Sequence, residues 1–230
     1  MSDPVEPVTA QDLVRWSEAL AGIARTGLGF TENLYERERF EEVLAVAADM
    51  RVAAGSAYDA ESLVAEWMRS VGHGVPGYQT PKVAVGAIVG NEKGEILLVQ
   101  RADSGVWLYP TGWADIGYSA SEVAVKEVEE ETGIECEVVQ LVAVLDGLRQ
   151  QFTRIPLYSL VFHCRATGGE LRAHPLETSD VGWFSLDDLP PDTAGADRWG
   201  ELARAALSGE PVQVEYDPPR SPTWRTMYDV

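Results

Sequence analysis

The stretch GWADIGYSASEVAVKEVEEETGI, residues 112–134, joins a glycine-containing loop to a glutamate-rich segment. The pattern predicts a helix from about Ala120 to Thr132. Gly133 is expected to end it, because glycine readily takes the left-handed conformation that follows a last helical turn. Strand-like segments precede and follow this unit, so the order along the chain is hairpin, loop, helix and strands.

Three glutamates of the predicted helix are spaced to act together. Glu127, Glu130 and Glu131 stand three and four positions apart, which places their carboxylates on one helical face, whereas Glu129 should point away. Like charges at this spacing destabilise a helix, so the cluster calls for a compensating charge. Carboxylate oxygens are the ligands that Mg²⁺ prefers. The alternative is a solvated acidic face partly offset by Lys126, and for the helix alone it is the commoner case.

The wider segment resembles the Nudix box, Gly-x5-Glu-x7-Arg-Glu-U-x-Glu-Glu-x-Gly-U, where U is a bulky apolar residue. The matching positions are Gly112, Glu127, Val128, Glu130, Glu131, Gly133 and Ile134. Two positions depart, since Tyr118 replaces the first glutamate and Lys126 replaces the arginine. Glu122 and Asp115 lie nearby as partial substitutes, and the three helix carboxylates are unaffected.

The resemblance implies a fold, a cofactor and a reaction. The fold would be an α+β Nudix α/β/α sandwich with a mixed sheet. Mg²⁺, or Mn²⁺, would be held by the carboxylates of Glu127, Glu130 and Glu131 and by the carbonyl of Gly112. These glutamates would be the catalytic residues for metal-assisted hydrolysis of a diphosphate bond.

Candidates for substrate binding lie outside the box. Arg101 ends a predicted strand and either grips a phosphate or forms a surface ion pair. Trp107 either stacks on a base or belongs to the core, and the same choice holds for Phe152 and Tyr158. Glu177 lies in the loop GELRAHPLETSD, residues 169–180. The general base is either one of the box glutamates or a residue of this loop, where Glu170, His174 and Glu177 are the candidates. The alternative for each loop residue is an ordinary exposed polar side chain.

The resemblance narrows to one Nudix subgroup, the hydrolases of X-linked nucleoside diphosphates. It rests on the box itself and on TGLGFTENLYERERFEEVLAVAADM, residues 26–50, which is similar to the helical N-terminal domain of that subgroup. Members hydrolyse compounds such as ADP-ribose and CDP-choline. The implied substrate is therefore a small nucleoside diphosphate derivative, cleaved to a nucleoside monophosphate and phospho-X.

The N-terminal part reads as helices with apolar stripes. One helix is expected over residues 9–27 with Gly27 ending it, a second over residues 31–54, and a third from Asp59. The stripes exceed what so small a unit can bury alone, which predicts a homodimer. The Gly- and Pro-rich residues 72–82 read as a linker.

The second part predicts a mixed α and β domain. A hairpin is expected over residues 83–90 and 95–101, further strands over residues 137–145, 157–164 and 180–186, and a short helix over residues 197–207. The predicted domains are therefore residues 1–78, helical and dimerising, residues 79–210, the Nudix domain, and residues 211–230, an irregular tail.

Composition excludes several classes of partner. The formal net charge of −19 disfavours binding to nucleic acid or to anionic membranes. No apolar run is long enough to span a bilayer, and the first residues lack the pattern of a signal peptide. Cys136 and Cys164 lie in apolar runs and read as reduced core thiols. Together these features predict a cytoplasmic protein.

Two rival functions stay open at this stage. A Nudix domain that has lost catalysis can serve as a nucleotide-sugar sensor, with the N-terminal helices docking a partner. The intact set of box glutamates and the acidic character of residues 1–78, without a basic recognition helix, disfavour this alternative. An RNA-processing nuclease is disfavoured by the same charge argument.

Overall fold

The computed structural model describes residues 7–71, 80–115, 117–153, 155–209 and 212–218. Its contacts divide the chain into two compact units, Met1–Pro81 and Lys82–Val230. The first is helical and the second is built on a mixed sheet, which confirms the predicted fold class. No helix among the described residues is long and apolar enough to cross a membrane.

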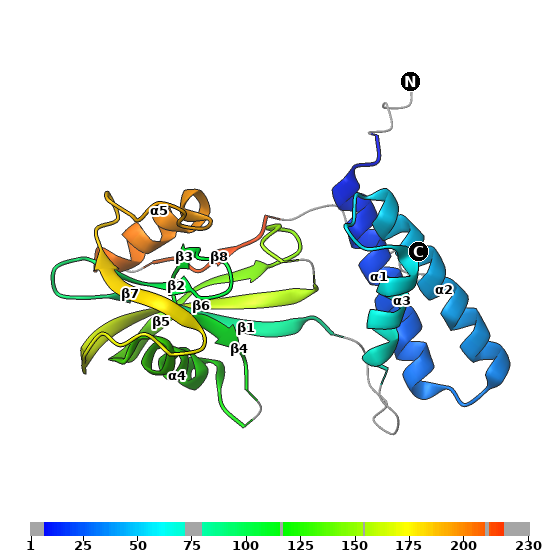
Figure 1. Ribbon diagram of the computed structural model, residues 1–230, viewed down its shortest axis with the longest axis horizontal. Coiled ribbons are helices and arrows are strands. Elements are labelled where there is room, and N and C mark those ends of the chain that lie inside the picture. The colour runs from blue at the N-terminus through cyan, green and yellow to red at the C-terminus, as the bar shows by residue number, and fades with distance from the viewer. Residues whose placement is uncertain (1–6, 72–79, 116, 154, 210–211, 219–230) are drawn as a thin grey trace, which may run out of the picture. The chain divides into compact units, whose positions relative to one another are not determined.

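The helical unit contains α1 (Ala10–Phe30), α2 (Leu34–Ala53) and α3 (Ala60–Arg69) (Figure 1). Each begins at a residue whose side chain accepts hydrogen bonds from the first-turn amides, namely Thr9, Asn33 and Asp59. Its core is small and rich in alanine, with Leu28, Leu44, Leu63 and Trp67 as the larger buried side chains. The nearly buried carboxylate of Glu18 in α1 forms an ion pair with Arg51 of α2.

The expectation that Gly27 ends the first helix is wrong, because α1 continues to Phe30. Gly27 serves a different purpose. A Cβ at this position would lie 2.2 Å from Cζ of Phe40, so the missing side chain makes room for an aromatic ring of α2. The second helix likewise begins later than expected, at Leu34, after its cap Asn33.

The second unit is organised around a sheet in the order β3-β2-β1-β6-β5-β8, with β4 paired to β1 and β7 to β2. Its strands are β1 (Lys82–Gly90), β2 (Ile96–Arg101), β3 (Trp107–Leu108), β4 (Thr111–Trp113), β5 (Ile134–Asp146), β6 (Leu157–Gly169), β7 (Thr178–Phe184) and β8 (Glu215–Tyr216). Strand β1 pairs in parallel with β6 along all of its own length, from Lys82 opposite Leu157 to Gly90 opposite Arg165. Most other pairs are antiparallel, and β5 with β8 is parallel.

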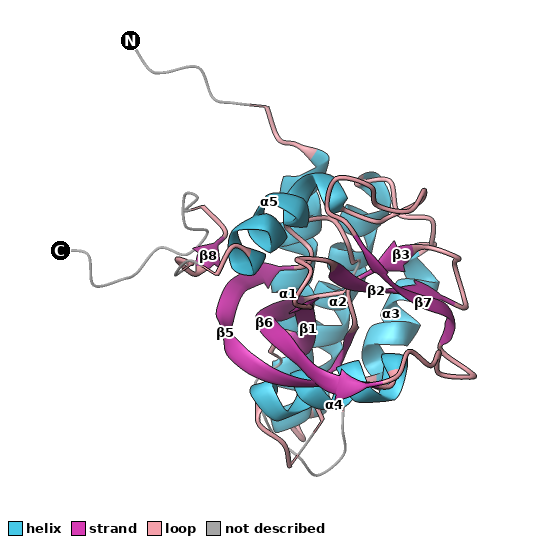
Figure 2. Cartoon of the chain, turned by 90° about the vertical axis from the view of Figure 1, so that its left-hand side faces the viewer, coloured by secondary structure: helices cyan, strands magenta, loops and turns pink. Residues whose placement is uncertain are grey.

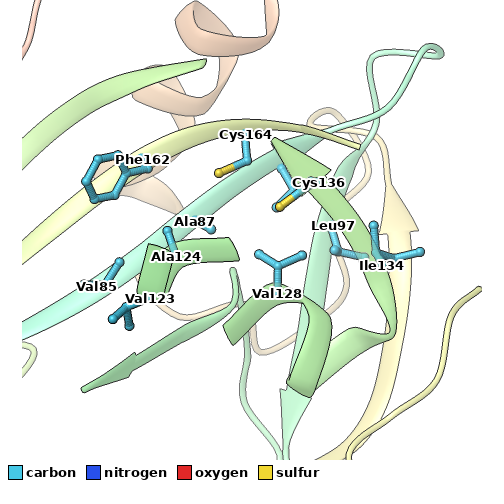
Figure 3. Close-up of a cluster of buried hydrophobic side chains, with 11 residues drawn as sticks. Val85, Ala87, Leu97, Val123, Ala124, Val128, Ile134, Cys136, Phe162 and Cys164 are labelled. Carbon is cyan, nitrogen blue, oxygen red and sulfur yellow. The ribbon is translucent and has the colours of Figure 1, made fainter. Parts of the chain in front are cut away.

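Two helices cover opposite faces of this sheet, α4 (Ala120–Thr132) and α5 (Ala196–Leu207) (Figures 1 and 2). Side chains alternate between the faces along β1. Val85 and Ala87 pack in the cluster under α4, which also contains both free cysteines (Figure 3). Val89 belongs to the same cluster. Ile88 packs in the other cluster, with Trp199 of α5.

The prediction of an irregular tail from residue 211 is wrong in part. Glu215 and Tyr216 form β8, which pairs with Ala143 and Val144 of β5. The sequence signal was too weak to reveal it, because an edge strand this short carries no periodicity of its own. Residues 219–230 lie outside the described part of the chain.

Candidate active site

Gly112 of β4 and Glu127 of α4 are in direct contact. A Cβ on Gly112 would lie 2.2 Å from Cδ of Glu127, so a side chain here would force this carboxyl group away from the strand. Strand β4 is itself held by antiparallel pairing of Gly112 with Val85 of β1. The half-buried Glu127 has a raised pKa, first because burial disfavours its charge, an effect that the nearby carboxylate of Glu130 reinforces.

Glu131 is the most buried of the three glutamates, with only 7% of its surface exposed. Its Oε2 atom accepts a hydrogen bond of 3.0 Å from the backbone N–H of Thr111, beside Gly112. Burial raises the pKa of Glu131 to about 8, and the nearby charges of Glu127 and Glu177 add to the effect. The hydrogen bond from Thr111 favours the charged form but does not offset the burial.

Glu130 is exposed and faces Lys126 instead. The Lys126 ammonium lies 2.7 Å from Oε2 of Glu130 and 3.2 Å from Oδ2 of Asp115. Asp115 is therefore engaged with the lysine that stands at the arginine position of the motif. Glu122 completes the capping box of α4, because its carboxylate accepts a hydrogen bond of 2.6 Å from the backbone N–H of Ser119.

The donor set fits a hard divalent cation. Among the residues that the structure describes, no three His, Cys, Asp or Glu side chains are already gathered around one metal position. Beyond the effect of burial, the charge of Glu127 raises the pKa of Glu131, and the charge of Glu130 raises that of Glu127, although Lys126 partly offsets the latter. Oxygen ligands of this kind suit Mg²⁺ or Mn²⁺.

The loop between β6 and β7 wraps the C-terminal end of α4. The backbone N–H of Arg172 donates to the carbonyl of Thr132 at 2.8 Å, and that of His174 donates to the carbonyl of Glu131 at 3.3 Å. Glu177 lies on this loop, exposed, with its Oε2 3.9 Å from Nδ1 of His174. Of the three base candidates on this loop, Glu177 is the one whose charge acts on Glu127 and Glu131.

Arg101 lies at the end of β2, where its charge also acts on Glu131. Its guanidinium makes two hydrogen bonds to Asp103, of 2.9 and 2.6 Å. Both side chains are exposed, and exposed ion pairs contribute only about 0–1 kcal/mol. A phosphate could therefore displace Asp103 at little cost.

The assignment of Trp107 to substrate binding is wrong. Its side chain is buried in the core cluster beneath α5, with its ring centroid 5.0 Å from that of Phe184 in an edge-to-face arrangement. A ring in this position is not available to a ligand. Sequence alone could not decide this, because an isolated tryptophan in a short strand has the same appearance in a core and in a binding site.

Known families match both units. The family described as the NUDIX domain matches residues 80–204, and the family described as the UDP-X-like, N-terminal oligomerisation domain matches residues 11–65. A Bacillus subtilis protein provisionally named ADP-ribose pyrophosphatase is 35% identical over 177 residues, covering 76% of this chain and 81% of the relative.

This chain belongs to the Nudix hydrolase family.

Solved Nudix structures agree with this assignment. A UDP-X diphosphatase is 31% identical, with a TM-score of 0.54, over 91% of this chain and all of the other. An ADP-ribose pyrophosphatase from Streptococcus suis is 37% identical, with a TM-score of 0.51, over 60% of this chain and all of the other. The protein is thus a Nudix hydrolase acting on diphosphate linkages, with an N-terminal domain of the oligomerisation type.

A cavity of about 700 Å³ adjoins the Nudix motif, a size typical of small-molecule sites. Arg101, Thr111 and Gly112 line it, as does Phe152, whose side chain is 52% exposed. Tyr158, the other predicted stacking residue, lies outside the described wall. Further polar residues line the wall, and their local sequence patterns carry no signal that could have revealed them: Ser104, Gln150, Thr153, Ser159, Asp197, Arg198 and Glu215.

Proposed function

We propose that this protein hydrolyses the diphosphate linkage of a nucleoside diphosphate joined to a second group, with Mg²⁺ or Mn²⁺ as cofactor. ADP-ribose is the substrate to test first. The observation that carries the proposal is the pairing of Glu127 and Glu131 against Thr111 and Gly112, two residues that line the cavity. Carboxyl groups that contact residues of the cavity wall suit a phosphorylated ligand that brings or shares a divalent cation.

Each residue has a proposed part in the reaction. The cation would be held by the carboxylates of Glu127, Glu130 and Glu131 together with the carbonyl of Gly112. Glu130 would first have to leave its ion pair with Lys126. When bound, a divalent cation neutralises the diphosphate and makes nearby water more acidic. Arg101 would exchange Asp103 for a phosphate oxygen of the substrate and orient it.

The general base is proposed to be a carboxylate that interacts electrostatically with the other carboxylates of the site. Glu131 and Glu177 are the candidates, because each lies close enough to influence the same cluster. Glu131 is buried and held in place by Thr111, whereas Glu177 lies on an exposed loop. Replacing a residue that moves a proton in the transition state typically costs about 10²- to 10⁴-fold in rate, so the two glutamine variants distinguish the roles.

The substrate class is supported by the relatives. One is named for ADP-ribose and one for UDP-X, and both names describe a nucleoside diphosphate carrying another group. The N-terminal match supports a further proposal, that the helical unit joins two copies of the chain into a homodimer.

The test is a phosphatase-coupled assay. Phosphatase releases inorganic phosphate from AMP and ribose 5-phosphate, but not from intact ADP-ribose. We expect phosphate release that requires Mg²⁺ or Mn²⁺ and stops with a chelator, and products with the masses of AMP and ribose 5-phosphate. CDP-choline, a UDP-sugar, nucleoside triphosphates and capped RNA complete the panel. Turnover of only the triphosphates or capped RNA would contradict the proposal, and tight binding of ADP-ribose without cleavage would favour a sensor.

A further inference from the structure

Residues 147–153 follow β5 and lead toward β6, and we refer to them as the 147–153 loop. Part of this loop lines the cavity. Gln150, Phe152 and Thr153 of this loop line the cavity that also contains Arg101 and Gly112. A ligand with its diphosphate against Gly112 therefore extends toward this loop with one of its attached groups. The loop is not relaxed, because Gln151 is a non-glycine residue at φ 61°. Such a conformation persists only where surrounding contacts hold it.

Two elements distant in sequence hold the loop at Gln150. On one side, the guanidinium of Arg198 in α5 donates a hydrogen bond to the Gln150 carbonyl. On the other side, Asp217 accepts a hydrogen bond of 2.5 Å from the side-chain amide of Gln150 and one of 2.6 Å from the backbone N–H of Asp146. Asp217 also lies 3.9 Å from Arg149, and only 12% of its side chain is exposed.

Asp217 belongs to a short segment, residues 212–218, that is itself anchored to the domain. Val212 packs against the core cluster under α5, and β8 pairs with Ala143 and Val144. Glu215 reaches the cavity wall. Asp217 stands outside the described wall, so any influence it has on a ligand must pass through the residues that it holds.

We infer that Asp217 is a positioning residue for substrate recognition, which holds the 147–153 loop so that Gln150 and Phe152 meet the group attached to the diphosphate. The exposed ring of Phe152 offers a flat apolar face to a base, and the amide of Gln150 offers a donor and an acceptor. The identity of the ligand rests on the proposed function, whereas the role of Asp217 in fixing the loop conformation does not.

The expected effect is on affinity and not on the chemical step. Asp217 makes no contact with Glu127, Glu130 or Glu131 among its described interactions. When Asp217 is replaced, the loop should sample other conformations. The apparent affinity for the substrate is then the intrinsic affinity multiplied by the fraction of molecules whose loop keeps the binding conformation. If a tenth remain so, KM rises about tenfold while kcat is nearly unchanged.

The experiment compares Asp217→Ala, Asp217→Asn and Asp187→Ala in the full chain. Asp187 is an exposed control whose ion pair is with Arg204. We measure KM and kcat for ADP-ribose and for CDP-choline with Mg²⁺, ADP-ribose binding in chelator by calorimetry, and amide exchange of residues 146–153 without ligand. Asp217→Asn keeps an acceptor for Asp146 and should fall between wild type and Asp217→Ala.

The supporting result for Asp217→Ala is faster exchange in the loop, a KM raised roughly tenfold with kcat within about twofold, and a changed preference between the two substrates. Asp187→Ala should show none of these changes. An unchanged KM, or a fall in kcat with KM preserved, would overturn the inference while leaving the proposed hydrolysis intact. Absence of turnover in the wild type would instead defeat the proposed function. In that case, amide exchange of residues 146–153 and the affinity for ADP-ribose would test the inference. If Asp217→Ala changed neither quantity, the inference would be overturned.

Discussion

At the scale of single residues, burial separates Glu131 from the other glutamates of α4. Glu131 has 7% exposure and a fixed hydrogen bond from Thr111, whereas Glu130 is exposed and bound to Lys126. Glu129, one position away, is exposed, and its spacing predicts that it points off the shared face. The same helix therefore supplies an informative variant and a matched control.

Glu131→Gln should reduce Mg²⁺-dependent turnover by roughly 10²- to 10⁴-fold, the range for loss of a catalytic proton-transfer group. It preserves size and the acceptor for the Thr111 amide, so the metal-free protein should keep or slightly increase its free energy of unfolding. Glu129→Gln should change neither quantity appreciably. Steady-state kinetics and urea unfolding measure both, and equal turnover of the two variants would refute the role of Glu131.

The raised pKa of Glu131 also predicts a pH dependence of stability in the metal-free protein. The folded state holds this proton more tightly than the unfolded chain, whose carboxyl has the ordinary pKa of 4.5. The contribution of the Glu131 carboxyl to the free energy of unfolding is therefore fully present below pH 4.5 and is lost as the pH rises through about 8. In chelator, the Tm of the wild type should fall across this interval relative to Glu131→Gln. A constant difference between their Tm values would argue against the raised pKa.

At the scale of elements, the end of α4 couples the helix to the loop that carries Glu177. Gly133 ends the helix with φ +71°, and a Cβ there would lie 2.5 Å from the carbonyl oxygen of Glu170. Gly94, in the turn between β1 and β2, has a similar φ of +76° and no atom within 4 Å of such a Cβ. Both glycines therefore have a left-handed backbone conformation, but only at Gly133 would a side chain also meet neighbouring atoms.

Gly94→Ala should lower the free energy of unfolding by about 1–2 kcal/mol, the cost of a left-handed residue with a side chain. Gly133→Ala should cost a further ~1–3 kcal/mol, because a crowded Cβ forces the backbone of the neighbouring loop to move. Displacing that loop should also lower turnover through Glu177. Equal losses of stability in the two variants would show that the loop does not rest against the end of α4.

At the scale of the whole molecule, the helical unit presents apolar side chains that it does not bury itself. Ile23, Phe30, Leu34, Tyr35 and Val46 are exposed by 62%, 56%, 79%, 81% and 54%. Exposed apolar side chains of this size are available for burial against another chain. The match of residues 11–65 to an oligomerisation domain agrees with this interpretation.

The full chain should therefore form a homodimer at micromolar concentration, with a mass by light scattering of twice 25.1 kDa. Val46→Glu places a charge where the single chain is already exposed, so it should shift the equilibrium toward monomer without lowering helix content. A wild-type mass equal to that of one chain would contradict the prediction.

Much of this protein was determined by its sequence alone. The ends of α4 follow from Ser119 and Gly133, and its glutamate face follows from helical spacing. The box and the apolar periodicities predicted the helical unit and the sandwich in the correct order. These features depend on neighbours within a few positions along the chain, where backbone geometry restricts what side chains can do.

Only the tertiary structure decided the rest. The burial of Trp107, the hydrogen bond from Thr111 to Glu131, and the clamp of Asp217 on Gln150 join residues that are distant in sequence. Such contacts depend on which strands pair and in which register, and the parallel pairing of β1 with β6 leaves no local signal. Burial then sets the proton affinity of each carboxylate, so identical glutamates on one helix acquire different properties only once the sheet has formed beneath them.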